Sequence, residues 1–248
     1  MKYLLYILIA INLSASIYKL DYVGELSLFG KVANATITYK NDGENYHIKV
    51  IGTGSGIVAR LTNNRRYVYE SIGKVDGTSL IPKHYITTEI TPEHKKIKDY
   101  SFEYNKSQIS VATHEEKEIY TTDVDITNLS VIRTMHIEKK DSSKIIKNIY
   151  HDDMITIFFN KRNKLLDMKE KESKIVYAVG SKDTQKGMYV ALKEIKNDKY
   201  IYSMKIKKDY LEDGSTEAEF ILDKDNFLFE TSLNGIMFFG NAVIKRVE

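Results

Sequence analysis

The chain has 248 residues, no cysteine and a formal net charge of +3 at pH 7, from 37 basic and 34 acidic residues. Without cysteine it can form neither a disulfide nor a thiolate metal site, so its stability must come from the burial of apolar side chains. The two signs of charge are interspersed, and this near-neutral balance leaves no basic patch of the kind that binds nucleic acid.

The first sixteen residues have the pattern of a secretory signal peptide. Lys2 precedes the apolar run Tyr3–Leu13, and the small residues Ser14, Ala15 and Ser16 follow it. A membrane anchor is the alternative, but a membrane-spanning helix needs about 20 apolar residues and this run is shorter. No other segment approaches that length. We therefore expect cleavage after Ala15 or Ser16, export to the periplasm of a Gram-negative bacterium, and no transmembrane segment in the mature chain.

Alternating apolar and polar residues predict β-strands through most of the chain that follows. In Lys31–Lys40, for example, every second residue is apolar, as in a strand with one buried face. The Asp-Gly pair within Asn41–Glu44 predicts a tight hairpin, and Asp76-Gly77 predicts another turn. About fifteen such strand candidates, each bounded by turn residues, favour an antiparallel sheet.

Two stretches interrupt the strand pattern. Glycines at positions 52, 54 and 56 predict a bend and then a short helical turn over about 57–62. Asp152 and Asp153 precede apolar residues at helical spacing, which predicts a helix over about 152–171 with an aspartate as its N-cap. The predicted fold class is thus mainly β, a strongly curved antiparallel sheet or a β-barrel, with one packed helix and one short helical turn.

We expect residues 17–248 to form a single β-rich domain, with a subdivision near residues 140–150 as the alternative. Several of its motifs are similar to those of a known family. They are Gly30-Lys31-Val32-Ala33-Asn34-Ala35-Thr36-Ile37, Gly54-Ser55-Gly56-Ile57-Val58-Ala59, Tyr69-Glu70-Ser71-Ile72-Gly73, Leu80-Ile81-Pro82-Lys83-His84-Tyr85 and Asp152-Asp153-Met154-Ile155-Thr156. In these motifs the chain resembles the DUF3108 family of bacterial exported proteins. The resemblance implies a β-rich protein of the cell envelope and no catalytic residue, because the function of the family is unknown.

No motif predicts catalysis or metal binding. Gly52–Gly56 matches neither a phosphate-binding loop nor the pattern around a nucleophilic serine, and a glycine-permitted bend explains it. The six histidines are dispersed, and no pair of carboxylates stands out from the surface acids. We therefore expect no cofactor and no metal, and an enzyme ranks third among the function classes. Asn105, in Glu103-Tyr104-Asn105-Lys106-Ser107, matches an extended N-glycosylation acceptor, with an ordinary surface asparagine as the alternative.

The first function hypothesis is a non-catalytic binding or carrier protein for an apolar small molecule or lipid, because curved sheets of this size can enclose an apolar cavity. A structural or assembly factor of the envelope, which contacts another envelope protein, is the alternative. If the sheet curls, aromatic and apolar residues of the stretch 52–85 would line its concave face, unless they only fill a closed core. The predicted ligand-binding residues are Ile57, Leu61, Tyr67, Tyr69, Leu80 and Tyr85.

Overall fold

A computed structural model describes residues 16–125, 130–147, 151–180, 187–207, 215–236 and 240–247. One antiparallel sheet of fourteen strands dominates it. The strands of this sheet are β1 (Ser16–Leu26), β2 (Gly30–Asn41), β3 (Asn45–Gly54), β4 (Arg66–Asp76), β5 (Ser79–Thr91), β6 (His94–Glu103), β7 (Gln108–Asp125), β8 (Ser130–Lys147), β10 (Ser173–Val176), β12 (Met188–Lys196), β13 (Lys199–Lys207), β14 (Ser215–Asp223), β15 (Leu228–Ile236) and β16 (Gly240–Arg246). The remaining elements are the parallel pair β9 (Asp152–Asp153) and β11 (Ala178–Val179), the helices α1 (Gly56–Leu61) and α2 (Thr156–Phe159), and the 3₁₀ turns η1 (Tyr104–Lys106) and η2 (Lys161–Asn163).

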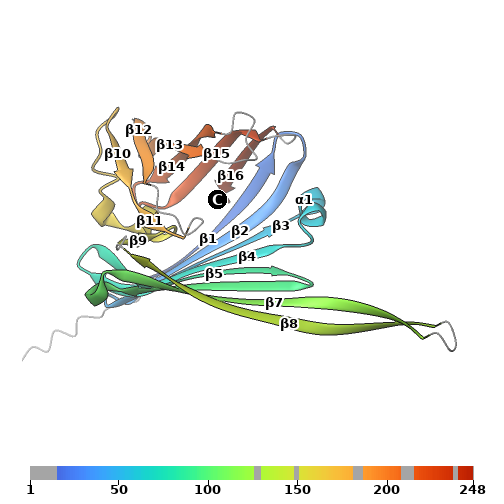
Figure 1. Ribbon diagram of the computed structural model, residues 1–248. Coiled ribbons are helices and arrows are strands. Elements are labelled where there is room, and N and C mark those ends of the chain that lie inside the picture. The colour runs from blue at the N-terminus through green and yellow to red at the C-terminus, as the bar shows by residue number, and fades with distance from the viewer. Residues whose placement is uncertain are drawn as a thin grey trace, which may run out of the picture.

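The large sheet is continuous from the C-terminal strands to the N-terminal ones. Its order is β10-β12-β13-β14-β15-β16-β1-β2-β3-β4-β5-β6-β7-β8, so β16 pairs with β1. Strands β1–β8, here the N-terminal half, and strands β10 and β12–β16, the C-terminal half, curl toward each other (Figure 1). The end strands β8 and β10 do not pair, so the sheet is open. The predicted fold class is confirmed, and of its two forms the structure shows the curved sheet.

The hairpin between β2 and β3 shows how local sequence sets these strands. The Asn41 side-chain oxygen accepts the N–H of Gly43 at 2.8 Å, and one Asp42 carboxylate oxygen accepts the N–H of Asn45 at 2.6 Å. Gly43 has φ +89°, a conformation that side chains with a Cβ avoid. The hairpin predicted from the Asp-Gly pair is confirmed.

Helix α1 confirms the helical turn predicted over about 57–62. Gly56 starts it with φ +57°, a left-handed conformation that favours glycine. At Gly54 a Cβ atom would lie 3.2 Å from the backbone nitrogen of Ala59, so the missing side chain lets α1 fold back on β3. The glycines of this stretch therefore permit a bend in the backbone that a side chain would hinder, as their spacing predicts.

The helix predicted over about 152–171 is wrong in its length, because α2 ends at Phe159. The next residue, Asn160, is extended, and its side chain pairs with the backbone of Leu80: Nδ2 donates to the carbonyl oxygen at 2.9 Å and Oδ1 accepts the N–H at 3.2 Å. Leu165 and Met168 are still buried, but from turns. Leu165 and Met168 thus reach the core without a helix. The hydrogen bonds between Asn160 and Leu80 of β5 stabilise the extended backbone that follows α2.

Two apolar clusters fill the inside of the curved sheet. Ile48 and Ile109, both fully buried, belong to the cluster on the N-terminal half, and Leu192 belongs to the cluster on the C-terminal half. Met154 and Leu228 contact both clusters. The two halves are therefore joined by side-chain packing as well as by the pairing of β1 with β16.

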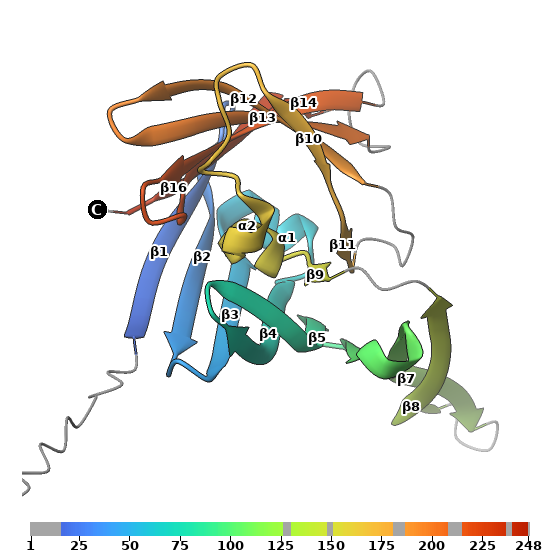
Figure 2. The same ribbon diagram turned by 90° about the vertical axis from the view of Figure 1, so that its left-hand side faces the viewer.

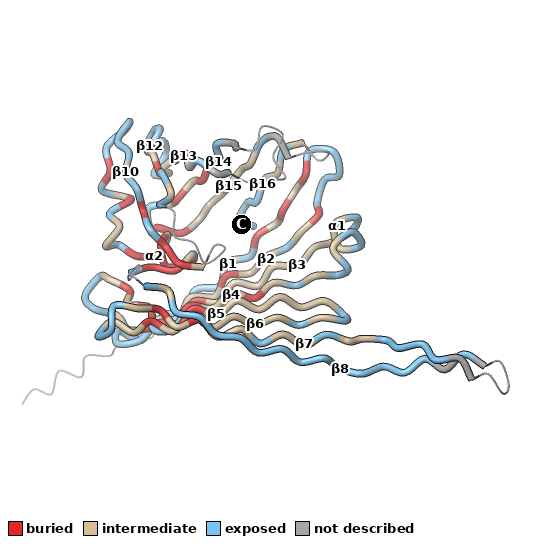
Figure 3. The backbone as a smooth tube through the Cα atoms, in the orientation of Figure 1, coloured by how far each residue is buried: buried red, intermediate tan, exposed pale blue. Residues whose placement is uncertain are grey.

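The far ends of β7 and β8 leave this core. Residues 115–125 and 130–140 are here called the arm. Beyond Lys117, the last residue of β7 that pairs with β6, the two described strands pair only with each other and project past the other strands (Figure 1). The tube in Figure 3 is largely exposed along the arm. Tyr120, Met135 and Ile137 are large apolar side chains that lie exposed on the arm. The arm therefore depends on strand pairing rather than on burial.

The predicted signal peptide, residues 1–16, lies outside the described residues except for Ser16, which begins β1. No helix in the described part of the chain has the length and apolar character needed to cross a membrane. The prediction of one domain, with a subdivision near residues 140–150 as its alternative, stays a prediction.

Candidate functional site

Residues 151–163 run through the inside of the curved sheet and are called the inner segment. They contain β9, α2 and η2 and lie between the two halves in both views (Figures 1 and 2). Ile155 and Phe159 pack on the N-terminal cluster, whereas Ile157 and Phe158 pack on the C-terminal cluster. A single turn of helix thus divides its apolar side chains between both walls of the sheet.

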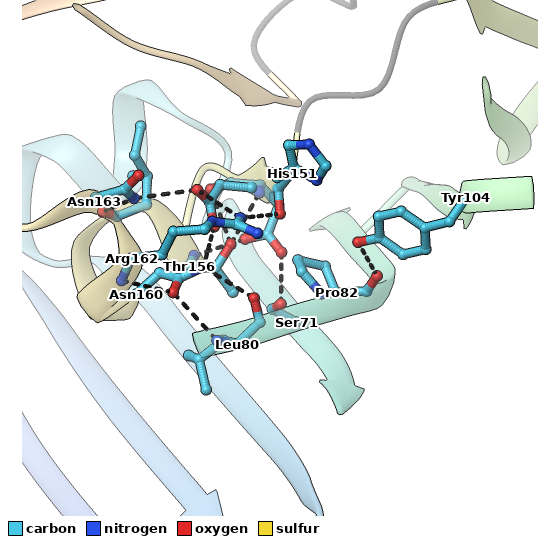
Figure 4. A network of polar contacts seen from close by, with 12 residues as sticks. Ser71, Leu80, Pro82, Tyr104, His151, Thr156, Asn160, Arg162 and Asn163 are labelled. Atoms are coloured by element: carbon cyan, nitrogen blue, oxygen red, sulfur yellow. Dashed lines mark hydrogen bonds and ion pairs between the residues drawn. The ribbon is translucent and has the colours of Figure 1, made fainter. Parts of the chain in front are cut away.

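Asp153 fixes the start of α2 to strand β4. One of its carboxylate oxygens accepts the N–H groups of Ile155 and Thr156, both at 2.8 Å. The other accepts the hydroxyl of Ser71 at 2.6 Å (Figure 4). The Ser71 hydroxyl also lies 3.0 Å from the hydroxyl of Tyr46. Burial raises the pKa of Asp153 to about 6, although the hydrogen bonds from Ser71 and the two amides act in the opposite direction.

Asp152 binds side chains at the C-terminal end of the inner segment. One carboxylate oxygen accepts Nδ2 of Asn160 at 2.7 Å, and the other accepts Nδ2 of Asn163 at 3.1 Å and lies 3.3 Å from the guanidinium of Arg162. Arg162 also donates to the carbonyl oxygen of His151 at 3.0 Å (Figure 4). Together with the bonds from Asn160 to β5, these contacts close the segment into a compact loop.

The two aspartates are suited to anchoring rather than to chemistry. All four of their carboxylate oxygens already accept hydrogen bonds from the chain, and both side chains are buried. No group of three or more histidine, aspartate or glutamate side chains within the described ranges is placed to hold a metal ion. The N-cap of α2 is Ile155 and not the predicted aspartate. Asp153 lies before the helix and accepts the N–H groups of Ile155 and Thr156 in the turn that leads into it.

An apolar cavity of about 450 Å³ lies between the inner segment and the two halves of the sheet. Sites for small molecules commonly have volumes of about 300–1,000 Å³ and mostly apolar walls. None of the described residues that line this cavity is charged. Its walls are Ile37, Val50, Tyr69 and Tyr85 from β2–β5, Met154, Ile155, Phe158 and Phe159 from the inner segment, Gly180 after β11, and Met204, Phe220, Leu228 and Thr231 from the C-terminal half.

Two tyrosines supply polar groups to this wall. No described residue accepts a hydrogen bond from the hydroxyl of Tyr69 or Tyr85. Burial raises the pKa of Tyr69 to about 12 and raises that of Tyr85 as well, so both hydroxyls stay protonated at neutral pH. A Cβ atom at Gly180 (φ +120°) would lie 2.4 Å from the Tyr85 ring, so only glycine lets the chain pass against that ring. The cavity is therefore mostly apolar, and Tyr69 and Tyr85, which line it, each carry a neutral hydroxyl group.

The structure brings four of the six predicted ligand-binding residues to hollows in the molecule. Tyr69 and Tyr85 line the apolar cavity. Tyr67 stacks on Tyr69 at 6.0 Å between ring centroids and lines a neighbouring hollow of about 210 Å³. Leu80 is buried in the N-terminal cluster and also lines a third hollow, described below. Ligand binding by these residues stays a prediction.

The other predicted positions lie elsewhere. Ile57 and Leu61 are exposed on α1 and line none of these three hollows. Asn105 is exposed in η1, at the turn between β6 and β7, and its glycosylation stays a prediction. The stretch 52–85 thus supplies one wall of the cavity but not the whole of it.

The sequence reasoning missed the walls that come from other parts of the chain. The apolar spacing around Phe158 and Phe159 was visible and predicted packing on the sheet, which is a usable signal for a cavity wall. Phe220 and Leu228 lie on strands whose alternation shows that one face is buried. Alternation does not show which distant strands that face meets, because this depends on how far the sheet curls.

Comparison with known protein families matches residues 17–226 to the family described as "Protein of unknown function (DUF3108)". The matched range contains the inner segment, all of β1 except Ser16, and strands β2–β8, β10 and β12–β14 of the large sheet. Neither a curated protein nor a solved structure matches the chain. The description of the family names no activity, so the geometry of the cavity is the basis for a function.

Proposed function

The chain belongs to the DUF3108 family of proteins of unknown function, and from that premise we propose that it is a non-catalytic carrier for an apolar or lipid-like molecule. The observation that carries the proposal is the cavity of about 450 Å³, whose described walls are uncharged and come from both halves of the sheet and from the inner segment. A catalyst would need free nucleophilic or acid–base groups, whereas the aspartates beside this cavity already accept hydrogen bonds.

Export to the periplasm is part of the same proposal. The family match begins at residue 17, and β1 begins at Ser16, which is where the predicted signal peptide ends. An exported carrier would meet its ligand in an aqueous compartment, where a long apolar molecule needs cover. N-terminal sequencing of the protein isolated from its own host tests this point, since an intact Met1 would contradict cleavage.

Binding of an uncharged fluorescent probe, N-phenyl-1-naphthylamine, tests the carrier proposal. Val50 lines the cavity, so Val50→Phe should fill part of it and weaken probe binding roughly tenfold or more, because the ligand would have to displace the new ring. Ile145→Phe, at an exposed position of β8, is the matched control and should leave binding unchanged. Equal binding by the wild type and a folded Val50→Phe variant would contradict the proposal.

One observation favours the alternative, an assembly factor that binds another envelope protein. β8 ends the large sheet, so one backbone edge of this eighteen-residue strand meets no other strand among the described residues. Val131, Met135 and Ile137, which alternate along it, are exposed. An exposed edge of this kind can pair with an extended segment of another chain.

Native mass spectrometry of the protein purified from its own host separates the two functions. A copurified molecule in the mass range of a lipid, lost in Val50→Phe, supports the carrier. A stoichiometric protein partner that survives Val50→Phe, with no small molecule bound, supports the assembly factor and contradicts the carrier.

A further inference from the structure

A second hollow, called the polar pocket, lies on the other side of Phe159 from the apolar cavity. It has a volume of about 400 Å³, and Phe159 lines both hollows. Its walls come from the start of β1, from β2, from the turn between β4 and β5, from the inner segment and from the turn between β14 and β15. The two hollows therefore share one aromatic side chain as their common wall.

Aromatic rings surround this common wall. The ring of Phe159 lies 5.8 Å from that of Tyr39 and 5.7 Å from that of Phe227, measured between centroids. Tyr18, which also lines the polar pocket, lies 5.1 Å from Phe227. Such rings give flat apolar area and, in the two tyrosines, hydroxyl groups at the edge. This arrangement suits the junction between the apolar and polar parts of one ligand.

The charges of the two hollows differ. Lys161 and Lys224 both line the polar pocket, and neither forms an ion pair with any acid that the structure describes. Asp225 is the one acidic residue in the described lining, so the pocket has a net charge of +1. The described walls of the apolar cavity contain no charge. Positive charge is thus found in the hollow on one side of Phe159, and uncharged walls in the hollow on the other.

We propose that the two hollows form one site for a long-chain anionic amphiphile. The hydrocarbon chain occupies the apolar cavity, and the carboxylate or phosphate head lies in the polar pocket near Lys161 and Lys224. This inference rests on the proposed carrier function and names the chemical class of its ligand. A lysine ammonium binds either head group as a point charge, so the shared chemistry is a single-chain anion.

Displacement of N-phenyl-1-naphthylamine by three competitors of equal chain length tests it: palmitate, 1-palmitoyl lysophosphatidic acid and the uncharged hexadecanol. In the double variant Lys161→Gln/Lys224→Gln, the two anions should bind roughly fivefold to tenfold more weakly, and the loss should shrink at high salt. Hexadecanol should bind as it does to the wild type, because it makes no contact that depends on the ammonium groups. Comparison of the binding of palmitate with that of lysophosphatidic acid shows whether the polar pocket prefers a carboxylate or a phosphate head group.

Lys31→Gln/Lys83→Gln is the matched control, because both lysines are exposed and line neither hollow. An anion-specific loss in the pocket variant alone supports the inference. Unchanged anion binding, or an equal loss in the control, would overturn the inference while hexadecanol binding keeps the carrier proposal. If neither the probe nor hexadecanol binds the wild type, the carrier proposal fails and this inference fails with it.

Discussion

The inner segment and the arm distribute polar and apolar side chains in opposite ways. The inner segment buries Asp152, Asp153 and Asn160 at the centre of the molecule, where each is held by several hydrogen bonds. The arm instead exposes apolar residues such as Met135 and Ile137 on β8, the strand that ends the sheet in the described part of the chain. Neither pattern could be recognised from polarity alone, because each reverses the usual preference of its residues.

The reason for the difference lies in what surrounds each region. A buried polar group is tolerated where the chain supplies its partners, and the inner segment has backbone and side-chain donors on all sides. An exposed apolar group costs little folding free energy but is available to a ligand or a partner. The inner segment is therefore suited to positioning the walls of the cavity, whereas the exposed apolar residues of the arm are the basis for proposing that the arm contacts another macromolecule.

Two isoleucines offer the largest and most direct test of this comparison. Ile157 in α2 is 1% exposed and Ile137 in the arm is 56% exposed. Ile157→Ala should lower the free energy of unfolding by about 2–5 kcal/mol, because it leaves a cavity between packed side chains. Ile137→Ala should change it by less than about 0.5 kcal/mol. Urea unfolding followed by circular dichroism measures both, and equal losses would show that the arm is packed in solution.

The pH dependence of stability tests the anchoring of the inner segment. Burial raises the pKa of Asp153 from 3.8 to about 6, so the folded state binds this proton more tightly than the unfolded state. Its contribution to stability is complete below pH about 4 and is lost as the pH rises through 6. Relative to Asp153→Asn, which keeps an oxygen to accept the amides of Ile155 and Thr156 but does not titrate, the wild type should lose up to about 3 kcal/mol between pH 4 and pH 7.

Unfolding curves of the wild type and Asp153→Asn at several pH values give this difference directly, since all other titrating groups are common to both. Parallel dependence on pH would mean that the carboxylate is better solvated than its burial implies. Glu138→Gln in the arm is the control, because Glu138 is exposed and its substitution should leave the pH profile unchanged.

A smaller effect is expected at Asn160, whose side chain joins the inner segment to β5. Asn160→Ala removes the hydrogen bonds with Leu80 and leaves one oxygen of Asp152 without this donor. The free energy of unfolding should fall by about 1–3 kcal/mol. Asn105→Ala, at an exposed position, should fall within about 0.5 kcal/mol of the wild type. If both variants were equally stable, the pairing of Asn160 with β5 would not stabilise the inner segment.

Asn160 also shows where prediction from sequence stops. The hairpin at Asn41–Asn45 could be predicted because its contacts are between neighbours in the chain. The end of α2 could not, because the partner of Asn160 is Leu80, eighty residues away. Sequence alone showed apolar spacing after Asp153 and so predicted a helix over about 152–171, whereas α2 has four residues. Local contacts are readable from sequence, and contacts that depend on the curl of the sheet are not.

The candidate site follows the same rule. Tyr69 and Tyr85 could be named because they lie in one run of alternating strands. Phe220, in β14, lines the same cavity as these two tyrosines. It does so only because β16 pairs with β1 and the sheet then curls. The open form of the sheet likewise depends on whether its two end strands meet, which no local pattern determines.

The smallest effect on stability is expected for the triple variant Val131→Thr/Met135→Thr/Ile137→Thr in the arm. These side chains are exposed on alternate positions of β8, so threonine keeps the strand and removes apolar surface at little cost in folding free energy. The free energy of unfolding should stay within about 1 kcal/mol of the wild type, and probe binding in the cavity should be unchanged.

Native mass spectrometry of the protein purified from its host tests the role of the arm. A protein partner lost only in this triple variant would assign partner binding to the arm. A partner retained by the triple variant but lost in Val50→Phe would place that contact near the cavity, and the division of roles between the arm and the inner segment would then be wrong.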